Sequence, residues 1–372
     1  MPASPEPPIP IKWTTFLDLL TSVLYIIKAM HSYLGLLILA FLVTFAVMVP
    51  YIGLLYKLKF TRKKETGEVR KSATKAFYKI REMHAGKAGV PTGGGIPVAV
   101  VVAVMFAAVF LITRGEGIIS GYPILGELVA ITFTFIGFGL LGFYDDVIKI
   151  LGFNKAGFFG LRMRHKFMLQ WVVALGSAAI LHWGLKIDFV YIPYWGPVFL
   201  GIGYFFLAAL VIVAFANAFD FTDGLDGLSC GLLMICLMAF WLISMADLDG
   251  VLATFIVLWL GSLMAYLYFN IYPARIMLGN VGGLAFGATL AVVGLLSGKI
   301  VALMVIGGVF LAEGLSSLLQ LYSKRFMKKR IFPIAPLHHW LQLVGWEEPK
   351  IVARAWLVGL VLAIFGVWLA VL

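Results

Sequence analysis

The sequence contains little charge and almost no cysteine. Only 13% of its 372 residues are charged, whereas 62% are hydrophobic. A soluble domain of this size cannot bury so much apolar surface, so most of the chain must have lipid as its solvent. The two cysteines, Cys230 and Cys236, fall within one apolar segment, which favours packing over a disulfide or a metal pair. The composition therefore predicts an all-α membrane protein.

Two common sequence signals are also absent. The N-terminus MPASPEPPIPIKW is rich in proline and lacks the basic region that opens a cleavable signal peptide. No GxxxxGKS or GxxxxGKT stretch is present, which argues against a P-loop ATPase. We expect residues 1–32 to form a periplasmic segment with an interfacial helix, and residues 33–372 to form one transmembrane domain.

Long apolar runs recur almost from end to end, and a membrane span needs about 20 apolar residues. They predict ten spans, at about 33–56, 94–113, 125–143, 167–184, 198–216, 228–246, 251–269, 284–297, 300–322 and 351–371. The loops form two alternating sets, and one set, with the start of the last span, holds 24 of the 29 Lys and Arg residues. This bias places that set in the cytoplasm and both termini outside. The net charge of +11 is thereby explained as topology, so no nucleic-acid partner is expected.

The outer loop 185–197 alternates polar and β-prone aromatic residues and ends in prolines. This pattern predicts a short β-hairpin on the outer surface. A transporter is the non-enzyme alternative, but the chain shows no inverted internal repeat. Only Glu127 and Glu313 are expected within spans, whereas a transport path needs polar residues at mid-depth.

The few acidic residues gather in two short cytoplasmic segments. Asp145 and Asp146 lie in GFYDDVIK, and Asp220, Asp223 and Asp226 lie in NAFDFTDGLDGL. Charge at a membrane face is costly, so such clustering usually marks a functional site. Adjacent carboxylates repel each other, which implies a metal ion or a positively charged environment around them.

Three further polar segments lie on the same side. HAGKAGVPTGGG (84–95) joins Lys87 to a glycine-rich helix start, where backbone N–H groups could hold phosphate oxygens. IYPARIMLGNVGG (271–283) is a second glycine-rich break, and APLHHWLQLVGWEEP places His338 and His339 in an aromatic-rich loop. Adjacent histidines do not share a helix face, which argues against a helix-borne metal pair.

Basic residues accompany the acids. They are Lys149, Lys155, Arg162, Arg164 and Lys166, with Gln170 one turn further. Carboxylates for Mg²⁺, lysines for phosphate and glycine turns for close backbone approach suit phosphoryl transfer from a nucleotide. A lipid co-substrate would explain why the site is built into a bundle of spans.

At these segments the sequence resembles the phospho-N-acetylmuramoyl-pentapeptide transferases, within the superfamily of polyprenyl-phosphate hexosamine-1-phosphate transferases. The resemblance covers about residues 33–371 and rests on six segments in the same order: HAGKAGVPTGGG, YDDVIK, NAFDFTDGLDGL, FNIYPARIMLGNVGGLAFG, the Glu313/Ser316/Gln320 spacing, and RIFPIAPLHHW followed by GWEE. It implies a Mg²⁺-dependent reaction of UDP-MurNAc-pentapeptide with undecaprenyl phosphate that gives lipid I and UMP. It also implies a homodimer in the bacterial inner membrane, in contact with membrane lipids and with its active site facing the cytoplasm.

The resemblance further implies roles for single residues. Asp145 and Asp146 match the family's aspartate pair, one member of which is proposed to take the proton of the lipid phosphate. His338 and His339 match the first two members of its histidine motif and are expected to be catalytic, with Asn280. The residues expected to contact substrates are Lys87, Thr92, Lys149, Lys155, Lys166, Gln170, Asn217, Asp220, Asp223, Asp226, Met277, Glu313 and Gln320.

The chain departs from the family pattern at the expected metal site. Asn280 stands where the family carries an aspartate tied to Mg²⁺, and Asp220 stands where it usually carries an asparagine. One hypothesis is a compensating exchange in which Asp220 takes over part of the Mg²⁺ binding, with Asp145, Asp146 and the amide oxygen of Asn280 as further ligands. This exchange requires Asp220 and Asn280 to lie close in space. The alternative is that Asn280 impairs activity and leaves a scaffold protein.

Other departures concern substrate preference. Met277 stands where the family tends to carry a phenylalanine able to stack on uracil. The third histidine of the family motif is replaced by Trp340, and an acid two residues later is replaced by Gln342. The same chemistry on UDP-GlcNAc is therefore the alternative reaction. Two mechanisms remain open, direct attack by the lipid phosphate and a two-step route through a phospho-sugar enzyme.

Overall fold

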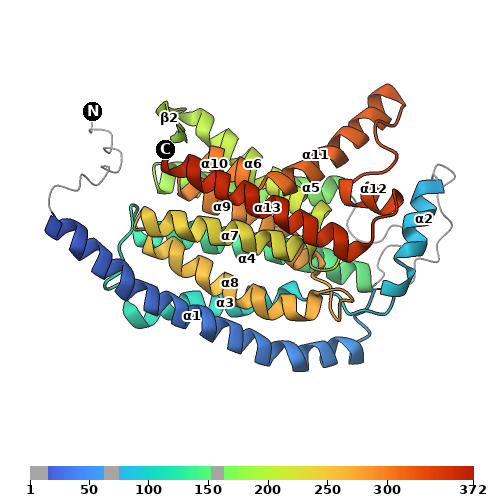
Figure 1. The fold of residues 1–372 in the computed structure, drawn as a ribbon, viewed down its shortest axis with the longest axis horizontal. Helices are drawn as coiled ribbons and strands as arrows, with labels where there is room; N and C mark the ends of the chain where they lie inside the picture. Colours follow the sequence, from blue (N-terminus) through green and yellow to red (C-terminus); the bar gives the residue numbers. More distant parts are fainter. Residues whose placement is uncertain (1–15, 63–74, 152–162) are drawn as a thin grey trace.

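A computed structural model describes residues 16–62, 75–151 and 163–372. Within these ranges the protein is an elongated helical bundle with one small sheet (Figure 1). The helices are α1 (Phe16–Lys57), α2 (Lys75–Met83), α3 (Gly95–Thr113), α4 (Ile124–Leu151), α5 (Met163–Ala179), α6 (Ile202–Thr222), α7 (Leu228–Ala246), α8 (Gly250–Asn270), α9 (Gly279–Leu296), α10 (Ile300–Ile306), α11 (Gly308–Tyr322), α12 (Leu337–Leu343) and α13 (Glu348–Val371). The prediction of an all-α membrane protein is confirmed.

In the described ranges, nine helices are long and apolar enough to cross a membrane, and one bent pair raises the number to ten. This agrees with the ten predicted spans, although the span predicted at 300–322 is not one straight helix. Ile300–Ile306 and Gly308–Met327 meet at 77° instead. Gly307 lies at the break, where glycine's poor helix propensity lets the chain turn. Figure 1 shows α11 leading away from the bundle.

The first helix is continuous. Helix α1 runs from Phe16 to Lys57, so no break in it marks residue 32. The division of the chain into residues 1–32 and 33–372 concerns the position of the membrane surface, and it stays a prediction.

Several segments expected to be loops are helix ends. Helix α4 continues to Leu151 and carries Asp145 and Asp146, and α6 continues to Thr222 and carries Asp220. Helix α9 already begins at Gly279, which puts Asn280 in its first turn. Hydropathy ends a span at the last apolar residue, whereas a helix can extend past the membrane surface because its backbone hydrogen bonds lie within the helix. These polar side chains are therefore held on rigid elements.

The predicted hairpin is confirmed, with a shifted end, and its position on the outer side stays a prediction. Strand β1 (Phe189–Ile192) pairs antiparallel with β2 (Gly196–Phe199), so the sheet extends beyond the expected loop 185–197. The next helix consequently begins at Ile202 and not at 198. The hairpin and the C-terminus lie at one end of the bundle, and α2 and α12 lie at the other (Figure 1). Tyr191 Oη donates to the carbonyl oxygen of Leu372, 3.4 Å away.

Helices α8 and α9 form the centre of the bundle, and nearly all their side chains are buried. Helix α9 packs against α4 and α6, and α8 packs against α1, α3 and α7. Glycines allow the closest approaches: a Cβ at Gly142 of α4 would overlap the carbonyl oxygen of Asn280, and one at Gly287 would overlap that of Phe215. Small residues at helix contacts are the usual means of tight packing in lipid.

We expect Gly142→Ala to separate α4 from the first turn of α9, because the clash is with backbone that cannot turn aside. The free energy of unfolding in detergent should fall by about 1–3 kcal/mol, the usual cost of overpacking. The matched control is Gly139→Ala, because a Cβ there would lie 3.9 Å from Ala285, an ordinary contact. Equal melting curves for the two variants would contradict this account of the packing.

Candidate active site

A lysine ammonium brings together polar side chains of three other helices, two carboxylates and one amide. Lys166 Nζ, on α5, lies 3.0 Å from Asp220 Oδ2 on α6 and 3.5 Å from Asp145 Oδ2 on α4. It also lies 3.5 Å from the amide oxygen of Asn280 on α9. Lys149 Nζ, one turn from Asp145, lies 3.0 Å from the same Asp145 oxygen. Residues far apart in the sequence thus form one polar centre at the end of the bundle.

Asn280 and Asp146 form the other half of this centre. The backbone N–H of Asn280 donates to Asp146 Oδ2 at 2.9 Å, and its side-chain amide donates to Asp146 Oδ1 at 2.6 Å. The carboxylate also lies at the N-terminus of α9, where the helix dipole favours negative charge. An aspartate at position 280 could not donate the second bond and would place two carboxylates together. Asn280 therefore stabilises Asp146 in a way that an aspartate at this position cannot.

Asp220 and Asn280 are neighbours. Both side chains accept from the one ammonium of Lys166, so the proximity that the compensating exchange requires is present. In the described part of the chain, no three His, Cys, Asp or Glu side chains form a group able to hold a metal ion. The oxygens around Lys166 Nζ, two from carboxylates and one from an amide, are nevertheless the hard donors that suit Mg²⁺.

The two glycine-rich segments bind each other. The N–H groups of Gly93 and Gly94 donate to the carbonyl oxygen of Met277 at 3.0 and 2.9 Å, and that of Gly95 donates to Leu278. The expectation that these N–H groups hold phosphate is therefore wrong, because they are already used. Thr92 pairs with Met277 in the same contact. The pairing sets the start of α3 beside the start of α9.

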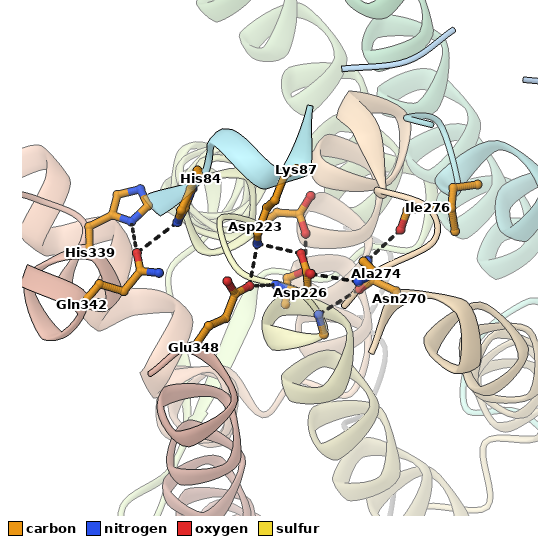
Figure 2. Close-up of polar contacts among 12 residues, drawn as sticks. His84, Lys87, Asp223, Asp226, Asn270, Ala274, Ile276, His339, Gln342 and Glu348 are labelled. Carbon is orange, nitrogen blue, oxygen red and sulfur yellow. Dashed lines mark hydrogen bonds and ion pairs between the residues drawn. The ribbon is translucent and has the colours of Figure 1, made fainter. Parts of the chain in front are cut away.

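Lys87 belongs to a second charged cluster, shown in Figure 2. Its Nζ lies 2.7 Å from Asp226 Oδ1 and 2.5 Å from Glu348 Oε1. Glu348 Oε1 also accepts from the N–H of Asp226 at 2.6 Å, and Asp226 Oδ2 accepts from the N–H of Ala274. Lys87 is only 8% exposed, so its charge is neutralised by two carboxylates. It holds the start of α13 and two loops together, whereas the sequence had suggested a free charge for phosphate.

Sequence reasoning missed Glu348 and Asn270. GWEE appeared only as a family marker, although an acid at a predicted helix start was a usable signal. Asn270 Oδ1 accepts from the N–H of Gly227, and Asn270 Nδ2 donates to the carbonyl oxygen of Ile276 (Figure 2). It thereby fixes the loop that carries Asp223 and Asp226. Burial raises the pKa of Asp223 to about 6, against a bond from Ser229 Oγ that lowers it.

The two histidines lie on α12, so their placement in a loop is corrected. His338 is buried, and its Nδ1 lies 3.2 Å from Glu313 Oε2. Its backbone N–H also donates to that carboxylate. His338 Nε2 is buried and has no hydrogen-bond partner within the described residues. It faces Gly224, where a Cβ would overlap it.

The remaining predicted site residues lie around these clusters, apart from one that the structure does not describe. Asn217 Nδ2 donates to Gln170 Oε1 at 2.8 Å, joining α5 to α6. Gln320 binds the backbone of Phe332 through both ends of its amide and so fastens the segment after α11. Direct contact of these side chains with substrate stays a prediction. Lys155 lies outside the described residues.

The bundle of spans with its acidic, lysine-bridged end defines an integral-membrane transferase. Residues 128–298 match the family described as glycosyl transferase family 4. The chain is 32% identical over 340 residues to the phospho-N-acetylmuramoyl-pentapeptide-transferase of Bacillus velezensis, covering 90% of this chain and 97% of that protein. It is 35% identical over 289 residues to that of Bacillus subtilis, covering 77% and 86%. The chain belongs to the phospho-N-acetylmuramoyl-pentapeptide-transferase family.

We expect Glu348→Ala to loosen the cluster of Lys87, because a buried ammonium then keeps one carboxylate and the N–H of Asp226 loses its acceptor. The free energy of unfolding should fall by about 1–3 kcal/mol. Glu347→Ala is the matched control, since this neighbour is exposed. Thermal unfolding in detergent measures both variants, and an equal effect of the two would refute the role given to Glu348.

Proposed function

We propose that this protein transfers phospho-MurNAc-pentapeptide from UDP-MurNAc-pentapeptide to undecaprenyl phosphate, giving lipid I and UMP. The centre formed by Lys166 with Asp145, Asp220 and Asn280 carries the proposal, because it combines carboxylates and a cation at the end of a membrane bundle. The family supports the choice of substrates. Attack by a phosphate on a nucleotide needs positioning and charge stabilisation, which such a centre supplies.

The direct route is the simpler mechanism for these residues. A carboxylate of the Asp145 and Asp146 pair takes the proton of the lipid phosphate, whose oxygen then attacks the β-phosphorus of the donor. The pair titrates as a unit because the two groups are adjacent. Lys149 and Lys166 hold positive charge beside Asp145 and are placed to bind phosphate oxygens. A phosphate is already a competent nucleophile, so no enzyme-bound intermediate is required.

We propose Mg²⁺ as the cofactor, held by oxygens of Asp145, Asp220 and Asn280. When bound, the ion neutralises the charge that develops on the departing UMP. The carboxylate of Asp220 makes up for the charge that Asn280 lacks, because both side chains meet at Lys166.

Exchange variants test the function and the metal site together. With UDP-MurNAc-pentapeptide, undecaprenyl phosphate and titrated Mg²⁺, we expect UMP release by the unaltered protein. Asp220→Asn should lower activity by about 10- to 100-fold at limiting Mg²⁺, the scale seen when support of a metal site is lost. The double variant Asp220→Asn with Asn280→Asp should regain most of that loss.

Other outcomes have definite meanings. If the unaltered protein releases no UMP and Asn280→Asp does, the protein is a transferase disabled at one metal ligand. Turnover of UDP-GlcNAc in place of the muramoyl donor would assign the alternative reaction. Absence of UMP release from all variants with both donors would refute the proposed activity and favour a scaffold protein.

We propose that the enzyme lies in the bacterial inner membrane as a homodimer, in contact with membrane lipids and with the site facing the cytoplasm. Lys87, Lys149 and Lys166 lie in the described segments at the end that carries the site, and the positive-inside rule favours the cytoplasm for a basic end. The homodimer follows the family, and its test is the mass of the protein in detergent.

Cysteine labelling tests the orientation. Cys230 and Cys236 are buried and free, so the background reaction should be low. We expect Trp195→Cys, at a hairpin position that is 83% exposed, to react with a membrane-impermeant maleimide added to spheroplasts. Lys329→Cys, exposed at the other end, should react only after lysis. The reverse pattern would overturn the assigned topology.

A further inference from the structure

Two histidines share one acceptor beside the cluster of Lys87. Gln342 Oε1 lies 3.1 Å from His84 Nε2 and 3.1 Å from His339 Nδ1 (Figure 2). Gln342 is 2% exposed, on α12, whereas both rings are half-buried and border the site. His84 comes from the end of α2, which packs against α12.

The acceptor determines where the ring protons are. An amide oxygen can only accept, so His84 must carry its proton on Nε2 and His339 on Nδ1. A neutral imidazole has one N–H, which leaves His84 Nδ1 and His339 Nε2 as acceptors. A single oxygen thereby fixes the tautomer of both rings.

The surroundings favour the neutral rings. Burial lowers the pKa of His84 to about 4, with a further contribution from the positive charges of Lys87 and Arg62. Burial also lowers the pKa of His339 to about 3, and His338 and Lys87 act in the same direction. An amide oxygen offers no full charge to stabilise an imidazolium, so it does not reverse these effects.

The neighbouring histidine shows the contrast. His338 and His339 have ring centroids 4.2 Å apart, yet the partner of His338 is the carboxylate of Glu313. The side chain of Glu313 is a carboxylate, whereas the amide of Gln342 is neutral. The chain thus holds two adjacent imidazoles with partners of different charge.

We propose that Gln342 is a positioning residue that locks His84 and His339 as neutral acceptors, so that this corner binds uncharged N–H or O–H donors of the sugar-peptide part of the substrate. The proposal rests on the proposed function for the identity of that substrate. An acceptor nitrogen repels phosphate oxygens, so the phosphates belong at the ammonium groups of Lys166 and Lys149. A site built on acceptors discriminates strongly, because they stay unpaired when the matching donor is missing.

Ring-nitrogen NMR of the histidines tests the lock without substrate. The chain has six histidines, whose signals single substitutions can assign. We expect the Nε2–H tautomer for His84 and the Nδ1–H tautomer for His339, both neutral at pH 6. A charged ring at pH 6 would overturn the proposal. The opposite tautomers would also overturn it, because they would mean that the amide nitrogen of Gln342 faces the rings.

Two substitutions test the consequence for binding. Gln342→Glu keeps the shape but adds a charge that raises the pKa of both histidines, so the acceptors become imidazolium. The Kd of UDP-MurNAc-pentapeptide should rise about tenfold at pH 6, the scale of one lost hydrogen bond, and recover by pH 8. Gln342→Asn is the control: its shorter amide cannot reach both rings, so the loss should not depend on pH.

UDP alone separates this corner from the nucleotide site. Its Kd should be the same for the unaltered protein and Gln342→Glu, because UDP lacks the sugar and peptide donors. An equal loss for UDP, or a Kd for the full donor that is unchanged from pH 6 to 8, would overturn the proposal. Absence of UMP release from the unaltered protein would instead refute the proposed function. The tautomers found by NMR would remain valid, because that test uses no substrate.

Discussion

The site depends on one half-buried cation, Lys166, placed between acids from two helices. Without Lys166, the carboxylates of Asp145 and Asp220 would lose the ammonium that they share across α4 and α6. Uncompensated charges at a membrane boundary cost several kcal/mol each. The ammonium of Lys166 attracts both carboxylates and the amide oxygen of Asn280, and these contacts join α5 to α4, α6 and α9. Lys166 is also one of the two lysines that we propose bind phosphate oxygens, so the cohesion of the site and its proposed chemistry share one group.

This electrostatic centre relies on the close packing beneath it. Gly142 and Gly287 let α9 approach α4 and α6 at backbone distance, which brings the first turn of α9 to Asp146. Gly279 also permits a close approach, since a Cβ there would lie 3.0 Å from Asp146 Oδ2. Short side chains in the membrane interior thus decide where the polar groups at its surface meet.

The sequence predicted the spans, the hairpin and the gathering of the acids, because these follow from hydropathy and from where charge is tolerated. It did not predict contacts between distant segments. Lys87 and Glu348 are 261 positions apart, and His84 and Gln342 are 258 apart, so no local pattern links them. The break at Gly307 was missed for another reason, since hydropathy reports that a segment is apolar and not its direction. The use of the Gly93 and Gly94 N–H groups likewise depended on a partner strand far along the chain.

The amide of Asn280 lets hydrogen bonds, in place of a metal ion, hold the two helix ends of the site together. An aspartate pair at positions 146 and 280 would need an ion between them before α4 and α9 could close. Asn280 closes the gap with its own two donors, so the contact between α4 and α9 needs no ion to form. A cation entering the proposed Mg²⁺ site would therefore not need to draw the ends of α4 and α9 together first.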